Sequence, residues 1–155
     1  MKASVASLLA TVAARCDDRG LRSTPSLYRT DEHALLLVVA SREPDTGHAR
    51  RLSRIALRFL IDAQDGEGRS FPSMDEAGGW AHPAETADAW GLSLWALGSA
   101  ATSHANDAVR ASARSSFDRA LRQRPSTLRS SAFAAIGASE VFSDDPTNRA
   151  ARRLL

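Results

Sequence analysis

The chain has 155 residues, of which 43% are hydrophobic and 25% charged, and its formal net charge is +2. This length and composition predict one globular domain, residues 1–155, that can bury an apolar core, and they exclude a predominantly disordered chain. No apolar run approaches the roughly 20 residues that span a bilayer, and basic residues are interspersed with acidic ones, so we expect neither a membrane span nor a nucleic-acid partner.

The first 16 residues could be either a secretory signal or a structural helix, and the choice affects the expected location of the protein. Their lysine, short apolar run and small residues are typical of a secretory signal, whereas the spacing of Val5, Leu8, Leu9 and Val12 is that of an amphipathic helix. We favour the helix. Cys16 is the single cysteine, so neither an intramolecular disulfide nor a cysteine metal cluster is expected, and a cytoplasmic location fits.

Helical periodicity recurs along the rest of the chain, and neither alternating strand patterns nor Asn-Gly hairpin turns occur. The sequence therefore predicts an all-α fold. The expected helices are 3–15, 31–42, 47–64, 84–102, 105–122, 126–139 and one that begins at 146. Pro125 and Pro146 lie where helices are expected to begin, and Thr46 and Asp145 lie at expected cap positions.

The links between these helices are unequal. Most are short, whereas 16–30 and 65–83 are long and carry Tyr, Trp, His, Met and acidic residues. If consecutive helices run antiparallel, both long links lie at one end of the molecule. The helices that begin near 31, 84 and 126 would then be parallel, with their N-termini at that end.

This arrangement predicts two rings of helices. The three parallel helices are rich in Ala, Leu, Gly and Ser, as expected of an inner layer, while 47–64 and 105–122 carry Arg and Asp on one face and read as an outer layer. The predicted fold is an α/α toroid-like arc of about three helical hairpins, an incomplete α/α barrel. A closed toroid needs more residues, so we expect an open arc, a piece of a longer protein, or a ring completed by a second copy or another polypeptide.

Four short blocks carry a resemblance to a known family. They are CDDRG at 16–20, SLYRTDEHALL at 26–36, GRSFPSM at 68–74 with Trp80 downstream, and ADAWGLSLWALG at 87–98. In this order they resemble the α/α-toroid helical domain associated with bacterial family-4-like glycosyltransferases. The resemblance covers roughly the first hundred residues and implies a role in carbohydrate metabolism. Ala87 and Leu92 stand where the family has an acid and an arginine, so any activity of those two groups is not carried over.

A second resemblance concerns architecture only. RFLIDAQDGEGRSF at 58–71 resembles the QW-type repeat of triterpene cyclases, in which Gln, Gly and an aromatic residue tie the hairpins of an α/α barrel together. The chain has no DxDD acid motif, so cyclase chemistry is not implied.

Three acids are candidate catalytic residues. Asp31 and Asp88 each fall in the first turn of an expected inner helix, and Glu85 lies three residues before Asp88. Glycoside cleavage uses two carboxyl groups about 5 Å apart for retention or about 6.5–9.5 Å apart for inversion, a spacing that acids on adjacent parallel helices can meet. Acids in a first turn also interact favourably with the helix dipole without any function. For Glu85, helix capping is the better interpretation. For Asp31, capping and a catalytic role remain equally open. Asp88 is the strongest candidate for a catalytic residue.

Aromatic residues could complete a sugar-binding site. Tyr28, Trp80 and Trp90 are candidate rings for stacking against a sugar, and His82 lies in the same link as Trp80. The four histidines lack paired-ligand spacing, and the chain has neither a Gly-rich phosphate loop nor a GxSxG motif. We therefore expect no metal site and no cofactor.

The segment 84–102 also has features that predict packing. Trp95 is grouped with leucines and is expected in the core. Gly91 and Gly98 each cost about 1 kcal/mol in a helix relative to alanine, and close packing against a neighbouring helix would offset that cost.

Two functions follow. The first is a carbohydrate-directed domain, associated with glycosyl transfer or glycan processing, whose carbohydrate or glycoconjugate ligand lies over the helix N-termini near 31 and 84. The second is a non-catalytic helical scaffold or protein-interaction module. If Asp31 and Asp88 approach within about 10 Å across a concave, aromatic-lined pocket, the first is favoured; if they point outwards with their partners satisfied, the second is.

Overall fold

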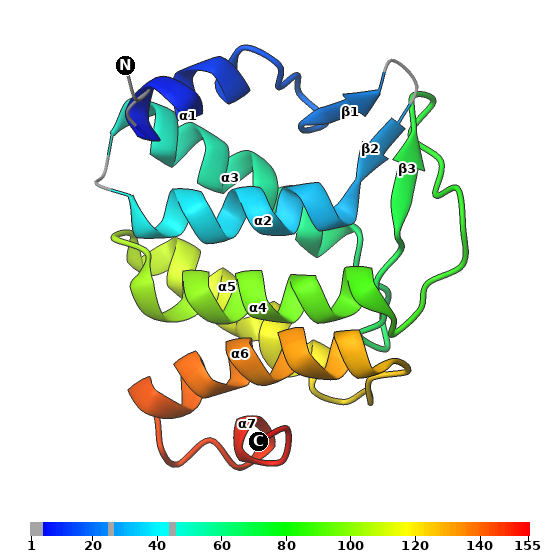
Figure 1. The fold of residues 1–155 in the computed structure, drawn as a ribbon, viewed down its shortest axis with the longest axis vertical. Coiled ribbons are helices and arrows are strands. Elements are labelled where there is room, and N and C mark those ends of the chain that lie inside the picture. Colours follow the sequence, from blue (N-terminus) through cyan, green and yellow to red (C-terminus); the bar gives the residue numbers. More distant parts are fainter. Residues whose placement is uncertain (1–4, 25–26, 44–45) are drawn as a thin grey trace.

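The computed structural model describes residues 5–24, 27–43 and 46–155, and Figure 1 shows a predominantly helical chain. Its helices are α1 (Val5–Ala13), α2 (Thr30–Arg42), α3 (Gly47–Asp62), α4 (Asp88–Ser103), α5 (Asp107–Ala120), α6 (Leu128–Asp144) and α7 (Arg149–Arg152). Each lies within or close to an expected helix, so the mainly helical class is confirmed. The start of the expected helix 3–15 lies outside the described residues.

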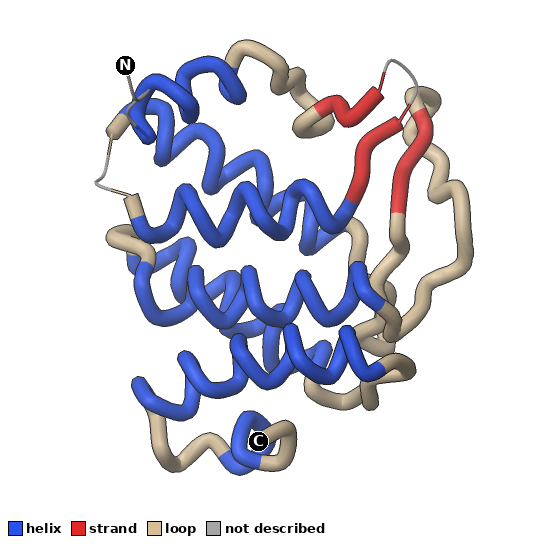
Figure 2. The backbone as a smooth tube through the Cα atoms, in the orientation of Figure 1, coloured by secondary structure: helices blue, strands red, loops and turns tan. Residues whose placement is uncertain are grey.

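The helices form two layers (Figures 1 and 2). α2, α4 and α6 lie side by side and begin at the same end, while α3 and α5 lie behind them and run in the opposite direction. α4 packs against both α2 and α6, α3 packs against α2, and α5 packs against α4. The predicted layer of parallel helices, backed by antiparallel ones, is therefore present.

A small antiparallel sheet joins the two long links. Its strands are β1 (Arg22–Thr24), β2 (Leu27–Arg29) and β3 (Ser73–Asp75), in the order β1-β2-β3. Tyr28 pairs with Met74, so both links do lie at one end of the molecule. The strictly all-α prediction is wrong, because strands of three residues are too short to show an alternating pattern and pair with segments distant in sequence.

Two N-terminal caps fix the starts of α3 and α6. The Thr46 side chain accepts a hydrogen bond from the Ala49 amide at 3.1 Å, which confirms its predicted capping role. Thr127 and Ser130 bond each other reciprocally as a capping box, so α6 begins after Thr127 and not directly at Pro125.

Two predicted helix starts are wrong. α4 begins at Asp88 and not at 84, because the backbone of Glu85 pairs with that of Ser70 and is therefore extended. Asp145 is not an N-cap: its carboxylate accepts hydrogen bonds from the amide and hydroxyl of Thr147, and α7 begins further along the chain.

Within the layer of parallel helices, α4 and α6 approach each other very closely. A Cβ atom added at Gly91 would lie 2.7 Å from backbone atoms of Ser130, and one at Gly98 would lie 2.6 Å from the carbonyl oxygen of Gly137. These separations leave no room for a side chain, so the two helices touch through their backbones. The predicted role of Gly91 and Gly98 in close helix packing is confirmed.

Candidate functional site

Asp31 and Asp88 lie at the starts of the parallel helices α2 and α4 and are partly exposed. Each is paired with an arginine: Asp31 with Arg29 at 2.5 Å, and Asp88 with Arg129 at 3.1 Å. An acid–base pair for glycoside cleavage places both carboxyl groups beside the bond that is cleaved, whereas each of these two carboxylates is bound to an arginine of the protein. The surroundings of both aspartates therefore fit structural ion pairs better than an acid–base pair.

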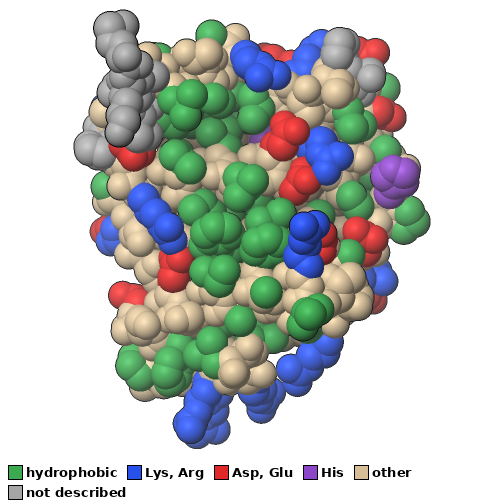
Figure 3. Space-filling view, in the orientation of Figure 1, with side chains coloured by type: hydrophobic (Ala, Val, Ile, Leu, Met, Phe, Trp, Pro, Cys, Tyr) green, Lys and Arg blue, Asp and Glu red, His purple; other side chains and the backbone are tan. Residues whose placement is uncertain are grey.

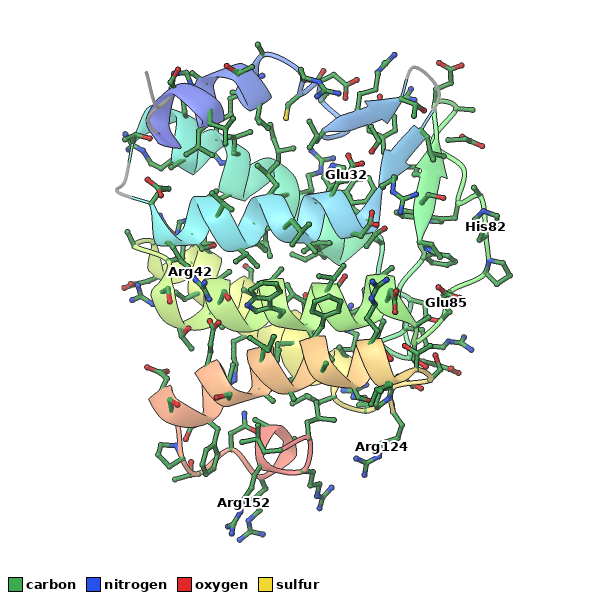
Figure 4. All side chains as sticks on the ribbon, in the orientation of Figure 1. Glu32, Arg42, His82, Glu85, Arg124 and Arg152 are labelled. Atoms are coloured by element: carbon green, nitrogen blue, oxygen red, sulfur yellow. The ribbon has the colours of Figure 1, made fainter. Side chains whose placement is uncertain are left out.

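Glu85 and His82 lie on the loop that leads into α4 (Figure 4). Both side chains are exposed, and within the described residues neither makes a hydrogen bond or an ion pair. Glu85 precedes the first turn of α4, so the capping interpretation is wrong for it. His82 lies at the outer edge of the loop, away from the helices.

Trp90 is a core residue. It is fully buried, and its Nε1 donates a hydrogen bond to the Gly68 carbonyl oxygen at 3.0 Å, so it cannot stack against a ligand. Trp95, the predicted core residue, is only partly buried, and its ring stacks against Phe133. The expected ligand-stacking role of Trp90 is therefore wrong, whereas Trp95 packs against the core as predicted but lies at its edge. α4 is apolar around most of its circumference, so its sequence does not show which tryptophan faces the core.

Tyr28 and Trp80, in contrast, lie together as predicted. Both belong to a small apolar cluster with Phe59 and Met74, at the end of the molecule where the two long links meet. Trp80 stacks on Phe71 with ring centroids 4.9 Å apart and meets Phe59 edge-on at 5.9 Å. The sheet therefore brings the aromatic residues of the two links into contact.

Asp17 organises the turn 17–20 beside this cluster. Its carboxylate accepts hydrogen bonds from the Tyr28 hydroxyl at 2.7 Å, the Arg22 guanidinium at 3.2 Å, and the amides of Arg19 and Gly20 at 2.9 and 3.2 Å. Burial alone would raise the pKa of Asp17, but these hydrogen bonds together lower it to about 2. The turn therefore carries a fixed negative charge at neutral pH.

His33 holds the same turn from within the core. It is fully buried on α2, and its ring stacks on Phe59 with centroids 3.7 Å apart. Its Nε2 accepts a hydrogen bond from the Leu21 amide at 2.8 Å, so its Nδ1 carries the proton and donates to the Arg29 carbonyl oxygen at 2.6 Å. A Cβ at Gly20 would lie 2.2 Å from Nε2, so glycine is required there. The fold thus selects the neutral imidazole.

We expect the free energy of unfolding to fall as the pH is lowered from about 7.5 to about 5.5. Burial lowers the pKa of His33 from its ordinary value of 6.5, although the hydrogen bond to Arg29 opposes this shift. Well above pH 6.5 the ring is neutral in both the folded and the unfolded state, so its full contribution to the free energy of unfolding is present. Below pH 6.5 the unfolded chain binds a proton that the folded chain does not, so stability falls by up to about 1.4 kcal/mol per pH unit. Urea denaturation at several pH values measures this slope.

Two variants isolate the contribution of His33 to that slope. His33→Gln removes the titrating ring and is expected to flatten the profile, whereas His82→Gln changes an exposed histidine and should leave it unaltered. An equally steep profile in His33→Gln would contradict the assignment.

A cleft of about 660 Å³ lies between α3, the turn 17–19 and the loop 74–80. Phe59, Met74 and Trp80 contribute its apolar and aromatic lining, and charged side chains of both signs form the rest. A second hollow of about 320 Å³ shares residues 17–19 and is lined in part by Tyr28. Of the predicted site residues, Trp80 lines the larger hollow and Tyr28 the smaller; the other five line neither.

Three arginines of α3 line the larger cleft. Arg51, Arg54 and Arg58 are spaced by three and four positions, so they share one face of the helix. Arg58 pairs with Asp62 at 3.7 Å, whereas Arg51 and Arg54 form no ion pair within the part of the chain that the structure describes. The charged face of 47–64 was predicted to be an outer surface, so these arginines were not among the predicted site residues. The available signal was that the three arginines share one face of a helix that leads directly into the link 65–83, which carries Phe71 and Trp80.

Comparison with protein-family models and with curated protein sequences finds no match to this chain. Among the described residues, no three His, Cys, Asp or Glu side chains gather closely enough to hold a metal ion. In the same ranges no helix combines the length and apolar character needed to cross a bilayer. The chemistry of the cleft is therefore the basis for assigning a function.

Proposed function

We propose that this chain is a cytoplasmic carbohydrate-binding domain, an open α/α toroid-like arc, whose ligand is an acidic sugar held in the cleft between α3 and the loop 74–80. The observation that carries this proposal is the presence of Trp80, Arg51 and Arg54 in one cleft. A pyranose ring has an apolar face that can pack on an aromatic ring, and its acid group can bond to arginine.

The charges in the cleft favour an acidic ligand over a neutral one. Its lining holds four arginines and three aspartates, and two of the aspartates are already engaged, Asp17 by its hydrogen bonds and Asp62 by Arg58. Arg51 and Arg54 are left to bind a uronate or a sugar phosphate, since a guanidinium bonds either group with two parallel N–H donors. The Asp18 carboxylate could accept hydrogen bonds from sugar hydroxyls.

The size of the cleft supports the same conclusion. Its volume of about 660 Å³ falls in the usual range of about 300–1,000 Å³ for small-molecule sites. The resemblance to a domain associated with glycosyltransferases supports a sugar as the ligand. We assign binding alone, without bond cleavage, because the predicted catalytic acids Asp31 and Asp88 are engaged in ion pairs and do not line the cleft.

Binding is tested with a panel of neutral and acidic mono- and disaccharides, monitored by calorimetry and tryptophan fluorescence. We expect glucuronic acid or a hexose phosphate to bind more tightly than the neutral sugar, with an affinity that falls as salt is added. Arg54→Gln removes one charge from the cleft and is expected to weaken binding at least about 10-fold, since hydrogen bonds to charged groups contribute about 1.5–3 kcal/mol.

Two matched controls locate the site. Arg124→Gln removes an exposed arginine from a different part of the molecule (Figure 4), and Asp88→Asn removes the strongest catalytic candidate from the sequence; neither should change the affinity. The proposal fails if no sugar of the panel binds at millimolar concentration, or if Asp88→Asn weakens binding and Arg54→Gln does not.

A second candidate function, a protein-interaction module, is favoured by a separate observation. The side of α2, α4 and α6 that faces away from α3 and α5 exposes large apolar side chains (Figure 3). A protein partner on this surface would not block the cleft, because the cleft is lined by α3 and the two long links.

A further inference from the structure

The exposed side of the parallel helix layer carries an apolar surface, here called the apolar face and formed by Leu35, Val39, Trp95, Phe133 and Ile136. Leu35 and Val39 lie one helical turn apart on α2 and are 46% and 41% exposed, and Ile136 on α6 is 42% exposed. Figure 3 shows apolar side chains gathered over α2, α4 and α6. Large contiguous apolar patches are uncommon on monomeric proteins and mark interaction sites.

The centre of the apolar face is aromatic. Trp95 on α4 and Phe133 on α6 stack with their ring centroids 6.1 Å apart, and both are only partly buried. The Trp95 Nε1 donates a hydrogen bond to Glu140, which also pairs with Arg42 of α2. Aromatic residues surrounded by charged ones are typical of the centre and rim of a protein interface.

Charged residues at the ends of the helices make this surface complementary to itself. On α2, Glu32 lies near the start of the helix and Arg42 at its end, both on the side shown in Figure 4. On α6 the order of charges is reversed, with Arg129 near the start and Glu140 near the end. When an identical face packs against this one with its helices antiparallel, α2 meets α2 and α6 meets α6. Arg42 then faces Glu32 of the second copy, and Arg129 faces Glu140 of the second copy.

The helix dipoles favour the same antiparallel arrangement. α2, α4 and α6 are parallel, so their positive N-terminal ends lie together at one end of the face and their negative C-terminal ends at the other. An antiparallel copy places positive ends over negative ends, whereas a parallel copy places like ends together. Exposed intramolecular pairs such as Arg42–Glu140 contribute little, so exchanging them for intermolecular pairs costs little.

The layer of α2, α4 and α6 that carries the apolar face approaches the size of one side of a stable dimer interface. Three helices of this length at a spacing of about 9 Å present roughly 650 Å² in projection. Stable interfaces bury about 800 Å² of accessible surface on each partner. We propose that a second copy of this chain covers the apolar face, in a two-fold symmetric dimer in which α4 packs against α4 of the other copy.

The mass of the full chain in solution tests this proposal, by light scattering and sedimentation over about 1–100 μM. We expect twice the monomer mass of 16.6 kDa. Val39→Glu places a charge in the apolar face and is expected to raise the dimer dissociation constant at least about 100-fold. Leu8→Glu makes the same kind of change at an exposed leucine of α1 and should leave the dimer intact. Circular dichroism verifies that each variant is folded, and Leu35→Lys is a second disruptive variant.

Charge exchange tests the orientation. Arg42→Glu is expected to weaken the dimer about 10-fold, and the double variant Arg42→Glu/Glu32→Arg to restore it. A wild-type chain that is monomeric at 100 μM, or a Val39→Glu and Leu35→Lys pair that both remain dimeric, would overturn the proposal. Failure of the double variant to restore affinity would overturn the antiparallel arrangement.

Discussion

Replacing Trp90 by alanine is expected to lower the free energy of unfolding by about 3–5 kcal/mol, one of the two largest effects of a single substitution anticipated in this chain. The indole is fully buried where α4 begins, and its Nε1 satisfies the carbonyl oxygen of Gly68. The substitution removes the apolar contacts, leaves a cavity and strips a buried acceptor of its partner. Urea denaturation followed by far-UV circular dichroism, at a fixed protein concentration, measures the loss.

Two further substitutions separate these contributions. Trp90→Phe retains an aromatic ring but lacks the N–H donor, so we expect a smaller loss, of about 1–3 kcal/mol. Leu128→Ala truncates a side chain that is 89% exposed and should change stability by less than about 0.5 kcal/mol. If Trp90 were a ligand platform, its removal would weaken sugar binding with little effect on unfolding, and that pattern would contradict the core assignment.

Gly137→Ala is expected to destabilise the protein by about 3 kcal/mol, although alanine is the better helix former by about 1 kcal/mol. A Cβ at this position of α6 would lie 2.3 Å from the carbonyl oxygen of Leu94 and 2.8 Å from the Cα of Trp95. These are backbone atoms of α4, so relief requires the two helices to separate. Thermal and urea denaturation of the variant measure the cost.

Gly47→Ala is the matched control for this substitution. Gly47 begins α3 and has no atom within 4 Å of its added Cβ. Alanine there should leave stability unchanged or raise it by a few tenths of a kcal/mol. If Gly137→Ala proved as stable as the wild type, the close approach of α4 and α6 would have to be wrong.

The sequence predicted the helical framework because helical periodicity and caps are local signals. The spacing of apolar residues located α2 to α6, and Thr46 marked the start of α3. The prediction that the two long links lie at one end of the molecule followed from the assumption that consecutive helices run antiparallel. The sheet could not be predicted in this way, because Tyr28 and Met74 pair across a large separation in sequence and each strand has only three residues.

The candidate site was only partly predictable. Tyr28 and Trp80 were identified from the aromatic composition of the links, and the structure brings them into one cluster. Asp31 and Asp88 were chosen for their positions in first turns, but the sequence does not show that Arg29 and Arg129 would neutralise them. Arg54 was missed because a charged helical face has the same pattern whether it meets water or a cleft.

The sheet has a consequence for how the cleft beside α3 forms. β2 runs directly into α2, and β3 follows α3, so the walls of the cleft meet only after the α2–α3 hairpin has docked. Contacts of such high contact order form late, after shorter-range helix pairs. If the proposed acidic sugar binds only the finished cleft, it should therefore slow unfolding while leaving the rate of refolding nearly unchanged.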